Sequence, residues 1–276
     1  MKPTFTHLSR TGLLLACLSL ALAPSCKKAD TPPSGQDSTF TVVSEGLEAE
    51  VYYDDLLTIF LQNANNNGLA RVSGSTCPVF YVTPADSSTF PKSILIDFGT
   101  ACTDPNGRTR SGRLQAQLSG PISDSGSVLQ IEPDSFYVDG VHVEGKETLT
   151  TLSSAGKLVF GVRVSSGLLT WPDGRTLQDS SQFVMTQTAG MGTTSFLDDV
   201  YQVTGDSYLV LADRSTLGMH VSAGLEKSLL CEDYISGILE VTYQNQTASI
   251  DFGNGTCDNK ATVTVGNQSQ VVTLPR

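Results

Sequence analysis

The feature that most constrains the fold is a phrase that the chain spells twice, each time closed by a cysteine. "IDFGTACTD" occupies residues 96–104, and "IDFGNGTCD" occupies residues 250–258. Ile96 and Phe98 alternate with polar residues in the first copy, as in a strand with one buried face, and the second copy keeps this alternation. The glycine after each phenylalanine permits a sharp turn toward the cysteine. The sequence therefore predicts one strand-and-turn unit that is built twice.

Four cysteines accompany the two copies: Cys77, Cys102, Cys231 and Cys257. The first two are 25 residues apart and the last two are 26 apart, which is a suitable length for a hairpin whose two ends lie at the same level. Paired Cα atoms of antiparallel strands lie about 4.5–5.5 Å apart, a separation that a disulfide can bridge. We predict the disulfides Cys77–Cys102 and Cys231–Cys257, which staple hairpins at 77–104 and 231–258. A crossed pairing, with Cys77 joined to Cys231 and Cys102 to Cys257, is the alternative.

The N-terminus has the pattern of a secretion signal, which we place at residues 1–25. Two basic residues precede "GLLLACLSLALA" at 12–23, an uncharged run shorter than the roughly 20 residues that cross a bilayer. "APSC", which ends at Cys26, resembles the lipobox of bacterial lipoproteins and predicts a lipid on that cysteine. The alternative is simple secretion after cleavage at Ala23, although a proline follows that bond. Lipidation predicts a membrane partner, reached through the anchor at Cys26.

The mature chain is predicted to begin with a flexible tether at 26–43, followed by a β-rich ectodomain at 44–276. The tether is rich in Pro, Ser, Thr and Gly and offers little apolar surface to bury. One helix is expected at 44–68, with Ser44 as its N-cap and "NNNG" at its end. Its expected core face comprises Tyr52, Leu56, Ile59 and Phe60.

The rest of the chain is typical of strands separated by turns. Alternating segments occur at 113–118, 157–164, 217–221 and 261–265, and turn signals occur near residues 104, 138, 171 and 203. The predicted fold class is mainly β: a large antiparallel sheet or sandwich of about 12–14 strands with one N-terminal helix. The sequence does not distinguish a sandwich from one curled sheet.

Composition excludes one class of partner. Removal of residues 1–25 takes Lys2 and Arg10 from the 17 basic residues and none of the 28 acidic ones, which leaves a formal charge of −13. Nucleic acid is therefore not expected as a partner, because its phosphates would be repelled.

The sequence offers few candidates for chemistry. There is no G-x-S-x-G and no H-E-x-x-H, and His142 and His220 alternate with apolar residues as surface positions of strands do. Each copy of the repeated phrase brackets its turn with two aspartates that could supply oxygen ligands to calcium: Asp97 with Asp104, and Asp251 with Asp258. The alternative for these aspartates is that they accept hydrogen bonds from turn amides.

Several segments together resemble the small uncharacterised lipoproteins of Bacteroidetes. They are "SCKKAD" after the signal, "IDFGTACTDPNGRTRSGRL" at 96–114, "WPDGRT" at 171–176 and "SIDFGNGTCDNKATVTV" at 249–265. The resemblance implies a lipid anchor in the outer membrane, on either side of it, and a β-rich ectodomain, but no activity. "DST" at 37–39 also resembles the short O-glycosylation signal of secreted Bacteroidetes proteins, with Ser38 as the acceptor.

From these observations we expect a lipid-anchored extracytoplasmic protein that binds or scaffolds without chemistry of its own. The alternative is an extracytoplasmic, glycan-directed hydrolase that uses a pair of Asp or Glu residues across a cleft. Calcium is the one cofactor for which the sequence provides candidate ligands.

Overall fold

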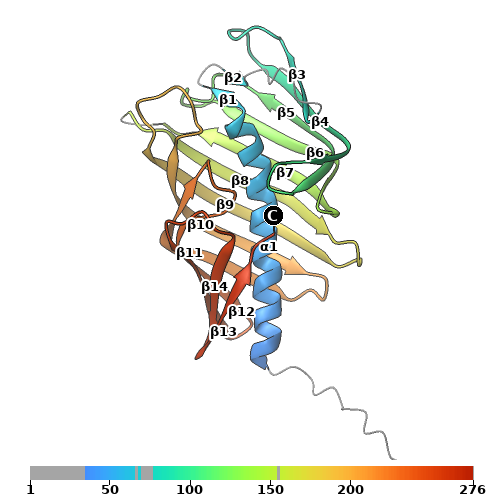
Figure 1. Cartoon of the computed structure of the whole chain (residues 1–276), viewed down its shortest axis with the longest axis vertical. Coiled ribbons are helices and arrows are strands. Elements are labelled where there is room, and N and C mark those ends of the chain that lie inside the picture. The colour runs from blue at the N-terminus through green and yellow to red at the C-terminus, as the bar shows by residue number, and fades with distance from the viewer. Residues whose placement is uncertain (1–34, 66–67, 70–76, 154–155, 276) are drawn as a thin grey trace, which may run out of the picture. The chain divides into compact units, whose positions relative to one another are not determined.

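The computed structural model describes residues 35–65, 68–69, 77–153 and 156–275, and these belong to one compact unit, Ser34–Arg276 (Figure 1). Cys26 and the predicted signal lie outside the described residues. One long helix and fifteen strands make up this part of the chain: α1 Gly35–Gln62, β1 Ala64–Asn65, β2 Gly68–Leu69, β3 Val79–Thr83, β4 Lys92–Thr103, β5 Thr109–Leu118, β6 Val128–Val138, β7 Val141–Thr151, β8 Val159–Thr170, β9 Thr176–Ala189, β10 Val200–Leu211, β11 Thr216–Ser228, β12 Ser236–Tyr243, β13 Gln246–Asn254, β14 Lys260–Val265 and β15 Gln268–Thr273.

Thirteen strands form a single antiparallel sheet in chain order. Each strand from β3 to β15 pairs with its sequence neighbours, so the sheet is a continuous meander with β3 and β15 as its two edges. β1 and β2 form a separate two-stranded ribbon. The predicted fold class is therefore confirmed, and the structure resolves the open alternative in favour of one curled sheet.

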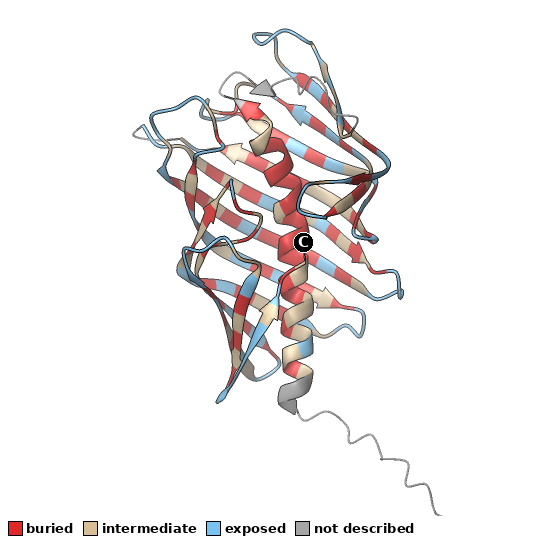
Figure 2. Cartoon of the chain, viewed as in Figure 1, coloured by how far each residue is buried: buried red, intermediate tan, exposed pale blue. Residues whose placement is uncertain are grey.

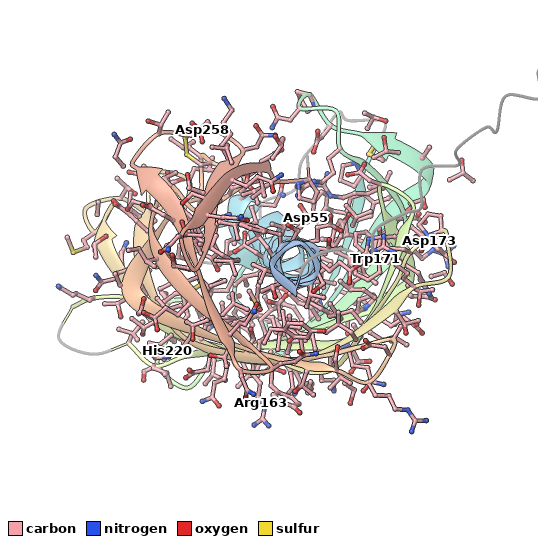
Figure 3. All side chains as sticks on the ribbon, turned by 90° about the horizontal axis from the view of Figure 1, so that it is seen from below. Asp55, Arg163, Trp171, Asp173, His220 and Asp258 are labelled. Atoms are coloured by element: carbon pink, nitrogen blue, oxygen red, sulfur yellow. A yellow bond between two sulfur atoms is a disulfide. The ribbon has the colours of Figure 1, made fainter. Side chains whose placement is uncertain are left out.

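The helix lies inside the curl of this sheet. Seen along its axis, α1 is ringed by strands, and inward side chains from the sheet surround it (Figure 3). Every residue from Ala49 to Leu61 is buried except Asp54, so the helix has no solvent-facing side over this span (Figure 2). A helix that is enclosed on all sides need not be amphipathic, because every direction from its axis leads into protein.

The alternation of each strand supplies the other half of the core. β9, for example, alternates buried and partly or fully exposed residues along most of its length, and the pattern recurs in β4 and β14. Since successive side chains of a strand point to opposite faces, one face of the sheet packs on the helix and the other faces solvent. The edge strands β3 and β15 are mostly exposed.

The helix begins earlier and ends earlier than the sequence predicted. It starts at Gly35, nine residues before Ser44, and so includes the last residues assigned to the flexible tether. Burial explains this, because Thr39 is 2% exposed and Val43 is fully buried. Ser44 is not a cap: its hydroxyl donates to the carbonyl of Phe40, one turn back in the same helix. The helix ends at Gln62 instead of near residue 68.

The predicted turn near residue 203 is also wrong. Residues 203–206 lie within β10, where the pairing with β11 shifts between Val203 and Asp206. Gly205 has a φ of 145° at this irregularity, and a Cβ there would lie 2.7 Å from the Cα of Phe183. The glycine therefore marks a β-bulge with close backbone packing, not a chain reversal.

The two copies of the repeated phrase form equivalent structures in β4 and β13. Asp97 Oδ1 accepts the Gly99 N–H at 2.8 Å, and Asp251 Oδ1 accepts the Gly253 N–H at the same distance. Both glycines have positive φ, 63° in the first copy and 91° in the second. The ring centroids of Phe98 and Phe136 lie 5.3 Å apart, as do those of Phe252 and Tyr234.

Each copy ends at the predicted disulfide. Cys77 pairs with Cys102 with their Cα atoms 5.7 Å apart, and Cys231 pairs with Cys257 with their Cα atoms 5.5 Å apart. The local pairing is therefore confirmed and the crossed pairing is not found. β4 lies near one end of the strand order and β13 near the other, but the curl of the sheet brings the two stapled hairpins close together, because Asn106 after β4 is hydrogen-bonded to Glu232 before β12.

Candidate ligand-binding cleft

The acidic residues of α1 determine how the helix is held in the sheet. The helix carries five acids between Glu45 and Asp55 and no lysine or arginine anywhere along its length. Each acid has a donor from the strands or turns of the sheet: Glu45 pairs with Arg175, Glu48 with Trp171, Glu50 with Ser207, Asp54 with Lys227, and Asp55 with Arg108 and Arg110. These contacts fix both the rotation of the helix and its position along the axis.

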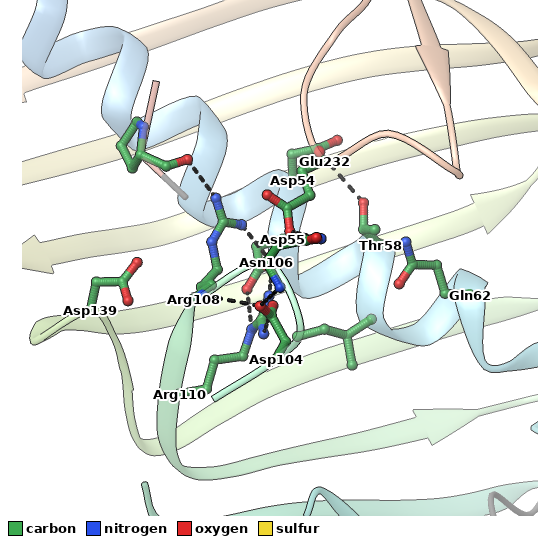
Figure 4. Close-up of polar contacts among 12 residues, drawn as sticks. Asp54, Asp55, Thr58, Gln62, Asp104, Asn106, Arg108, Arg110, Asp139 and Glu232 are labelled. Carbon is green, nitrogen blue, oxygen red and sulfur yellow. Dashed lines mark hydrogen bonds and ion pairs between the residues drawn. The ribbon is translucent and has the colours of Figure 1, made fainter. Parts of the chain in front are cut away.

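The densest of these contacts surrounds Asp55, near the C-terminal end of α1 (Figure 4). Arg110 binds the carboxylate in a bidentate manner: Nε donates to Oδ2 at 2.8 Å and Nη2 donates to Oδ1 at 2.5 Å. Arg108 Nη1 reaches Oδ1 at 2.9 Å. Burial acts to raise the pKa of Asp55, but the hydrogen bonds and charges of the two arginines outweigh it, and the pKa is lowered. Asp55 is therefore a carboxylate at neutral pH.

The same two arginines join the β4–β5 turn to other parts of the chain. Arg110 Nη1 binds Asp104 Oδ2 at 2.8 Å, and Arg108 Nη2 donates to the carbonyl of Pro275 at 2.7 Å. Asp104 also accepts the backbone N–H groups of Asn106 and Arg108 through Oδ1. One ion-pair cluster thus links the helix, the first stapled hairpin and the C-terminal end of the described chain.

A main pocket opens at this cluster, and together with a neighbouring side pocket it forms what we call the cleft. The main pocket, of about 310 Å³, lies between the last turns of α1 and the β4–β5 turn, and its lining includes Asp55, Gln62, Cys102 and Arg108. The side pocket, of about 240 Å³, lies between the β11–β12 connection and the loop after β13. Asn106, Leu230 and Glu232 line both pockets.

Of the three shared residues, Asn106 and Glu232 are joined by a hydrogen bond and Leu230 is an exposed apolar side chain. Asn106 Nδ2 donates to Glu232 Oε1 at 2.7 Å across a sequence separation of 126 residues. Leu230 next to it is 73% exposed, the highest value among the large hydrophobic residues identified as exposed in the described chain. The Cys77–Cys102 disulfide lines the main pocket and the Cys231–Cys257 disulfide lines the side pocket. Both copies of the repeated phrase therefore contribute to one cleft.

Two polar atoms of residues that line the cleft are buried inside the protein and have no hydrogen-bond partner among the described residues. They are Arg108 Nε, in a residue that lines the main pocket, and Asp233 Oδ1, in a residue that lines the side pocket. Asp233 is 6% exposed, and burial raises its pKa to about 6 against the lowering effect of Lys227 and Arg108. Since buried polar groups are nearly always paired, such atoms require a reason.

The aspartates predicted as calcium ligands cap turns in the structure. Asp97 and Asp251 accept glycine amides as described above, Asp104 is held by Arg110 and two amides, and Asp258 Oδ1 accepts the Lys260 N–H at 3.2 Å. Among the described residues no group of three or more His, Cys, Asp or Glu side chains is placed to hold a metal ion. Calcium binding stays a prediction, and the observed contacts favour the alternative of turn capping.

The remaining candidates lie away from the cleft. His220 is exposed, with Nδ1 2.6 Å from Asp206, and His142 stacks on Tyr137 with ring centroids 4.5 Å apart. Ser38 lies in the first turns of α1 and is partly buried. No helix of the described chain is both long enough and apolar enough to cross a bilayer.

Sequence reasoning missed most of the residues that form the cleft. Arg108 and Arg110 lie 53 and 55 residues from Asp55, and nothing local indicates that they meet. One signal was present: "DPNGRTR" places two arginines at alternate positions after a turn, where they share a face of the next strand. Asp233 and Leu230 have no comparable signal.

Comparison with known proteins adds no assignment, since no family model, no curated protein and no solved structure matches the chain.

Proposed function

We propose that the protein is a lipid-anchored, extracytoplasmic binding module whose small polar ligand occupies the cleft. The observation that carries this proposal is the convergence of the two stapled hairpins and the helix end on one double pocket. Anchoring at Cys26 in the outer membrane rests on the lipobox and on the resemblance to Bacteroidetes lipoproteins, and the two disulfides agree with an oxidising compartment.

The size and chemistry of the cleft suit a small ligand. Ligand sites typically enclose about 300–1,000 Å³ and combine apolar walls with a few placed polar groups. The main pocket, of about 310 Å³, has this character, because Phe98, Pro78 and Leu230 lie beside Thr58, Gln62 and Asn106.

The site is rigid before any ligand arrives. Disulfides fix a wall in each pocket, and Asp55 locks the side chains of Arg108 and Arg110. Preorganised groups lose little conformational entropy when a ligand binds, and that saving increases affinity. The rigidity supports recognition of a defined molecule.

The main pocket offers less support for catalysis. An acid–base mechanism needs a carboxyl group that exchanges a proton with substrate near neutral pH. Asp55 has both oxygens bonded to arginines, and Asp104 has both oxygens bonded to turn amides and to Arg110. The role that these contacts give to Asp55 and Asp104 is to hold Arg108 and Arg110 in place.

Blocking the cleft tests the proposal. The variant Leu230→Trp places a larger side chain where the two pockets meet, on a residue that is already 73% exposed, so the fold should be retained. A library of small polar fragments would be screened by ligand-observed NMR against the wild type and this variant. The matched control is Leu197→Trp, which changes a 42% exposed leucine that lines neither pocket.

We expect fragments that bind the wild type and the Leu197→Trp protein and lose binding to Leu230→Trp. A screen in which no fragment binds the wild type, or in which Leu230→Trp binds as the wild type does, would refute the proposal.

A glycan-directed hydrolase is the second candidate, and one observation favours it. Asp233 has a pKa of about 6 and shares the side pocket with Glu232 and Asp258, so one acid and one carboxylate could coexist there. Glycosidases need two such groups about 5–10 Å apart. Turnover of chromogenic glycosides that disappears in Asp233→Asn would establish this activity, and no turnover across a broad panel would exclude it for those sugars.

A further inference from the structure

The outer face of the sheet carries a pocket that is separate from the cleft. This outer pocket, of about 490 Å³, opens over β8, β9 and β10 and shares no lining residue with the two pockets of the cleft. Its exposed or partly exposed lining residues are Ser166, Leu168, Gln178, Ser180, Tyr208 and Val210. They lie on the face that is turned away from α1, as Arg163 of β8 does in Figure 3.

A β-bulge shapes the floor of the outer pocket. The register of β8 against β9 shifts between Val164 and Gly167, so that two residues of β8 stand opposite Ser180 alone. At Gly167 the strand comes so close to the helix that a Cβ would lie 2.6 Å from the hydroxyl oxygen of Tyr53. The chain therefore dips toward α1 at this point, and the dip leaves a hollow on the outer face. Bulges that locally redirect a strand are common beside functional sites.

One wall of the outer pocket is the ring of Tyr208, which is 53% exposed. Its cross-strand partners are Ser180 on β9 and Gly218 on β11, and both are too small to cover an aromatic ring. A Cβ at Gly218 would meet no atom within 4 Å, so the ring does not lean over that glycine either. The ring is thus free to stack against the apolar face of a ligand.

The other lining groups define the chemistry of that ligand. Ser166, Gln178 and Ser180 offer hydroxyl and amide groups that both donate and accept hydrogen bonds, and none of the three is engaged in a side-chain hydrogen bond within the described chain. The exposed lining has no charge, because the one acid, Asp179, is 3% exposed and lies on the inward face of β9. An ionic ligand would therefore find no counter-charge, whereas a neutral one with an apolar face and a polar edge fits.

We infer that the outer pocket binds a neutral saccharide, with one pyranose ring stacked on Tyr208. A pyranose presents C–H groups on its face and hydroxyls around its edge, which matches an exposed aromatic ring bordered by uncharged polar side chains. Gln178 and the two serines are placed to receive the hydroxyls. This site goes beyond the proposed function and does not depend on it, because no residue belongs to both the outer pocket and the cleft.

The probes are cellotetraose, mannotetraose and xylotetraose, compared with sorbitol and adenosine. Sorbitol has similar hydroxyls without a rigid ring, and adenosine has an aromatic base. Binding to the whole mature protein would be detected by saturation-transfer NMR and quantified by titration. Tyr208→Ala removes the ring at an exposed position, and Tyr208→Phe removes only its hydroxyl. The matched control is Tyr81→Ala, which changes a 56% exposed tyrosine of the edge strand β3 that does not line the outer pocket.

We expect at least one tetrasaccharide to bind the wild type and the Tyr81→Ala protein equally, and Tyr208→Phe to bind nearly as well. Tyr208→Ala should weaken binding about tenfold, the scale expected for the loss of one stacking ring. If Tyr208→Ala does not fold, Ser180→Ile takes its place. It fills the pocket beside the ring at an exposed strand position that suits a β-branched residue, and it should weaken binding in the same way.

The inference is wrong if no tetrasaccharide binds the wild type, or if binding is unchanged by the loss of the ring or by Ser180→Ile. Sorbitol binding as tightly as the sugars would contradict stacking. Adenosine binding that requires Tyr208, without any sugar binding, would make this a nucleobase site and overturn the inference. Leu230→Trp, which blocks the cleft, should leave saccharide binding unchanged. Loss of binding in that variant would place the sugar in the cleft and refute the outer site, while the proposed function would stand.

Discussion

The strongest prediction concerns Glu50, which α1 carries into the interior of the curled sheet. Glu50 is 6% exposed, and its Oε1 accepts a hydrogen bond from Ser207 Oγ at 2.5 Å. Burial raises its pKa from 4.5 to about 7; the Ser207 hydrogen bond opposes this rise and the charge of Asp54 adds to it. Glu147 and Asp179 are also buried, with pKa values raised chiefly by burial.

The direction of the pH effect follows from these values. Below pH 4.5 Glu50 is protonated in both the folded and the unfolded chain, and it does not oppose folding. Between pH 4.5 and about 7 the unfolded chain releases this proton and the folded protein keeps it, so the free energy of unfolding falls as the pH rises. At about 1.4 kcal/mol per pKa unit, this shift lowers stability by about 3 kcal/mol above pH 7.5, an effect that Glu50 shares with Asp179, whose pKa the charge of Glu50 also raises.

The variant Glu50→Gln tests this reasoning, because glutamine resembles protonated glutamate and does not titrate. We expect wild type and variant to have similar stability at pH 4.5, and the variant to be about 3 kcal/mol more stable at pH 8. Urea unfolding at pH 4.5, 6, 7 and 8 gives the free energies, and the exposed Glu240→Gln on β12 controls for the loss of one carboxyl group. If both proteins lose stability equally between pH 4.5 and 8, the proposed role of Glu50 is wrong.

Three further predictions follow from the ion pair, the disulfides and the anchor. Asp55→Asn should lower the free energy of unfolding by about 3–5 kcal/mol in chemical denaturation, because Arg108 would remain buried without its ion-pair partner and Arg110 would keep only Asp104; a loss below 1 kcal/mol would contradict this. The double variant Cys77→Ala/Cys102→Ala should cost about 3.5 kcal/mol from loop-closure entropy, measured against the oxidised wild type, and an unchanged midpoint would show that this staple does not stabilise the fold. Cys26→Ser should move the protein from the membrane to the soluble fraction after cell lysis, and continued membrane association would rule out a lipid at this position.

Local pattern was sufficient for the parts of the fold that repeat over short distances. Ile96 and Phe98 alternate with polar residues and are buried, as are their counterparts in the second copy, because a strand with one buried face imposes a period of two. The cysteine pairing also followed from spacing alone, since both hairpins close locally. These features depend on residues near one another in the chain.

The predictions that were wrong concern features that depend on residues distant from one another in the sequence. Residues 35–43 have the composition of a linker, but Val43 is buried by the strands around the helix. Composition alone does not predict a contact with residues so distant in sequence. Glu50 and Asp55 were not among the four residues expected on the core face of the helix, and both are buried because the sheet encloses α1. The cleft could not be predicted from the sequence for the same reason, because its donors and acceptors come from three segments that are far apart in the chain.

The enclosed helix has a consequence for how the chain reaches its folded state. α1 precedes every strand of the sheet, and its acids find their donors on strands as late as β11. Without the helix, the concave face of the sheet would present a large apolar surface to water, and without the sheet, the helix would expose its buried residues. A polypeptide beginning near residue 77 should therefore be insoluble alone. It should recover its structure when a synthetic peptide spanning 35–65 is added. The two pieces would then form a split protein, in which the soluble fraction measures how much of the helix has bound to the sheet.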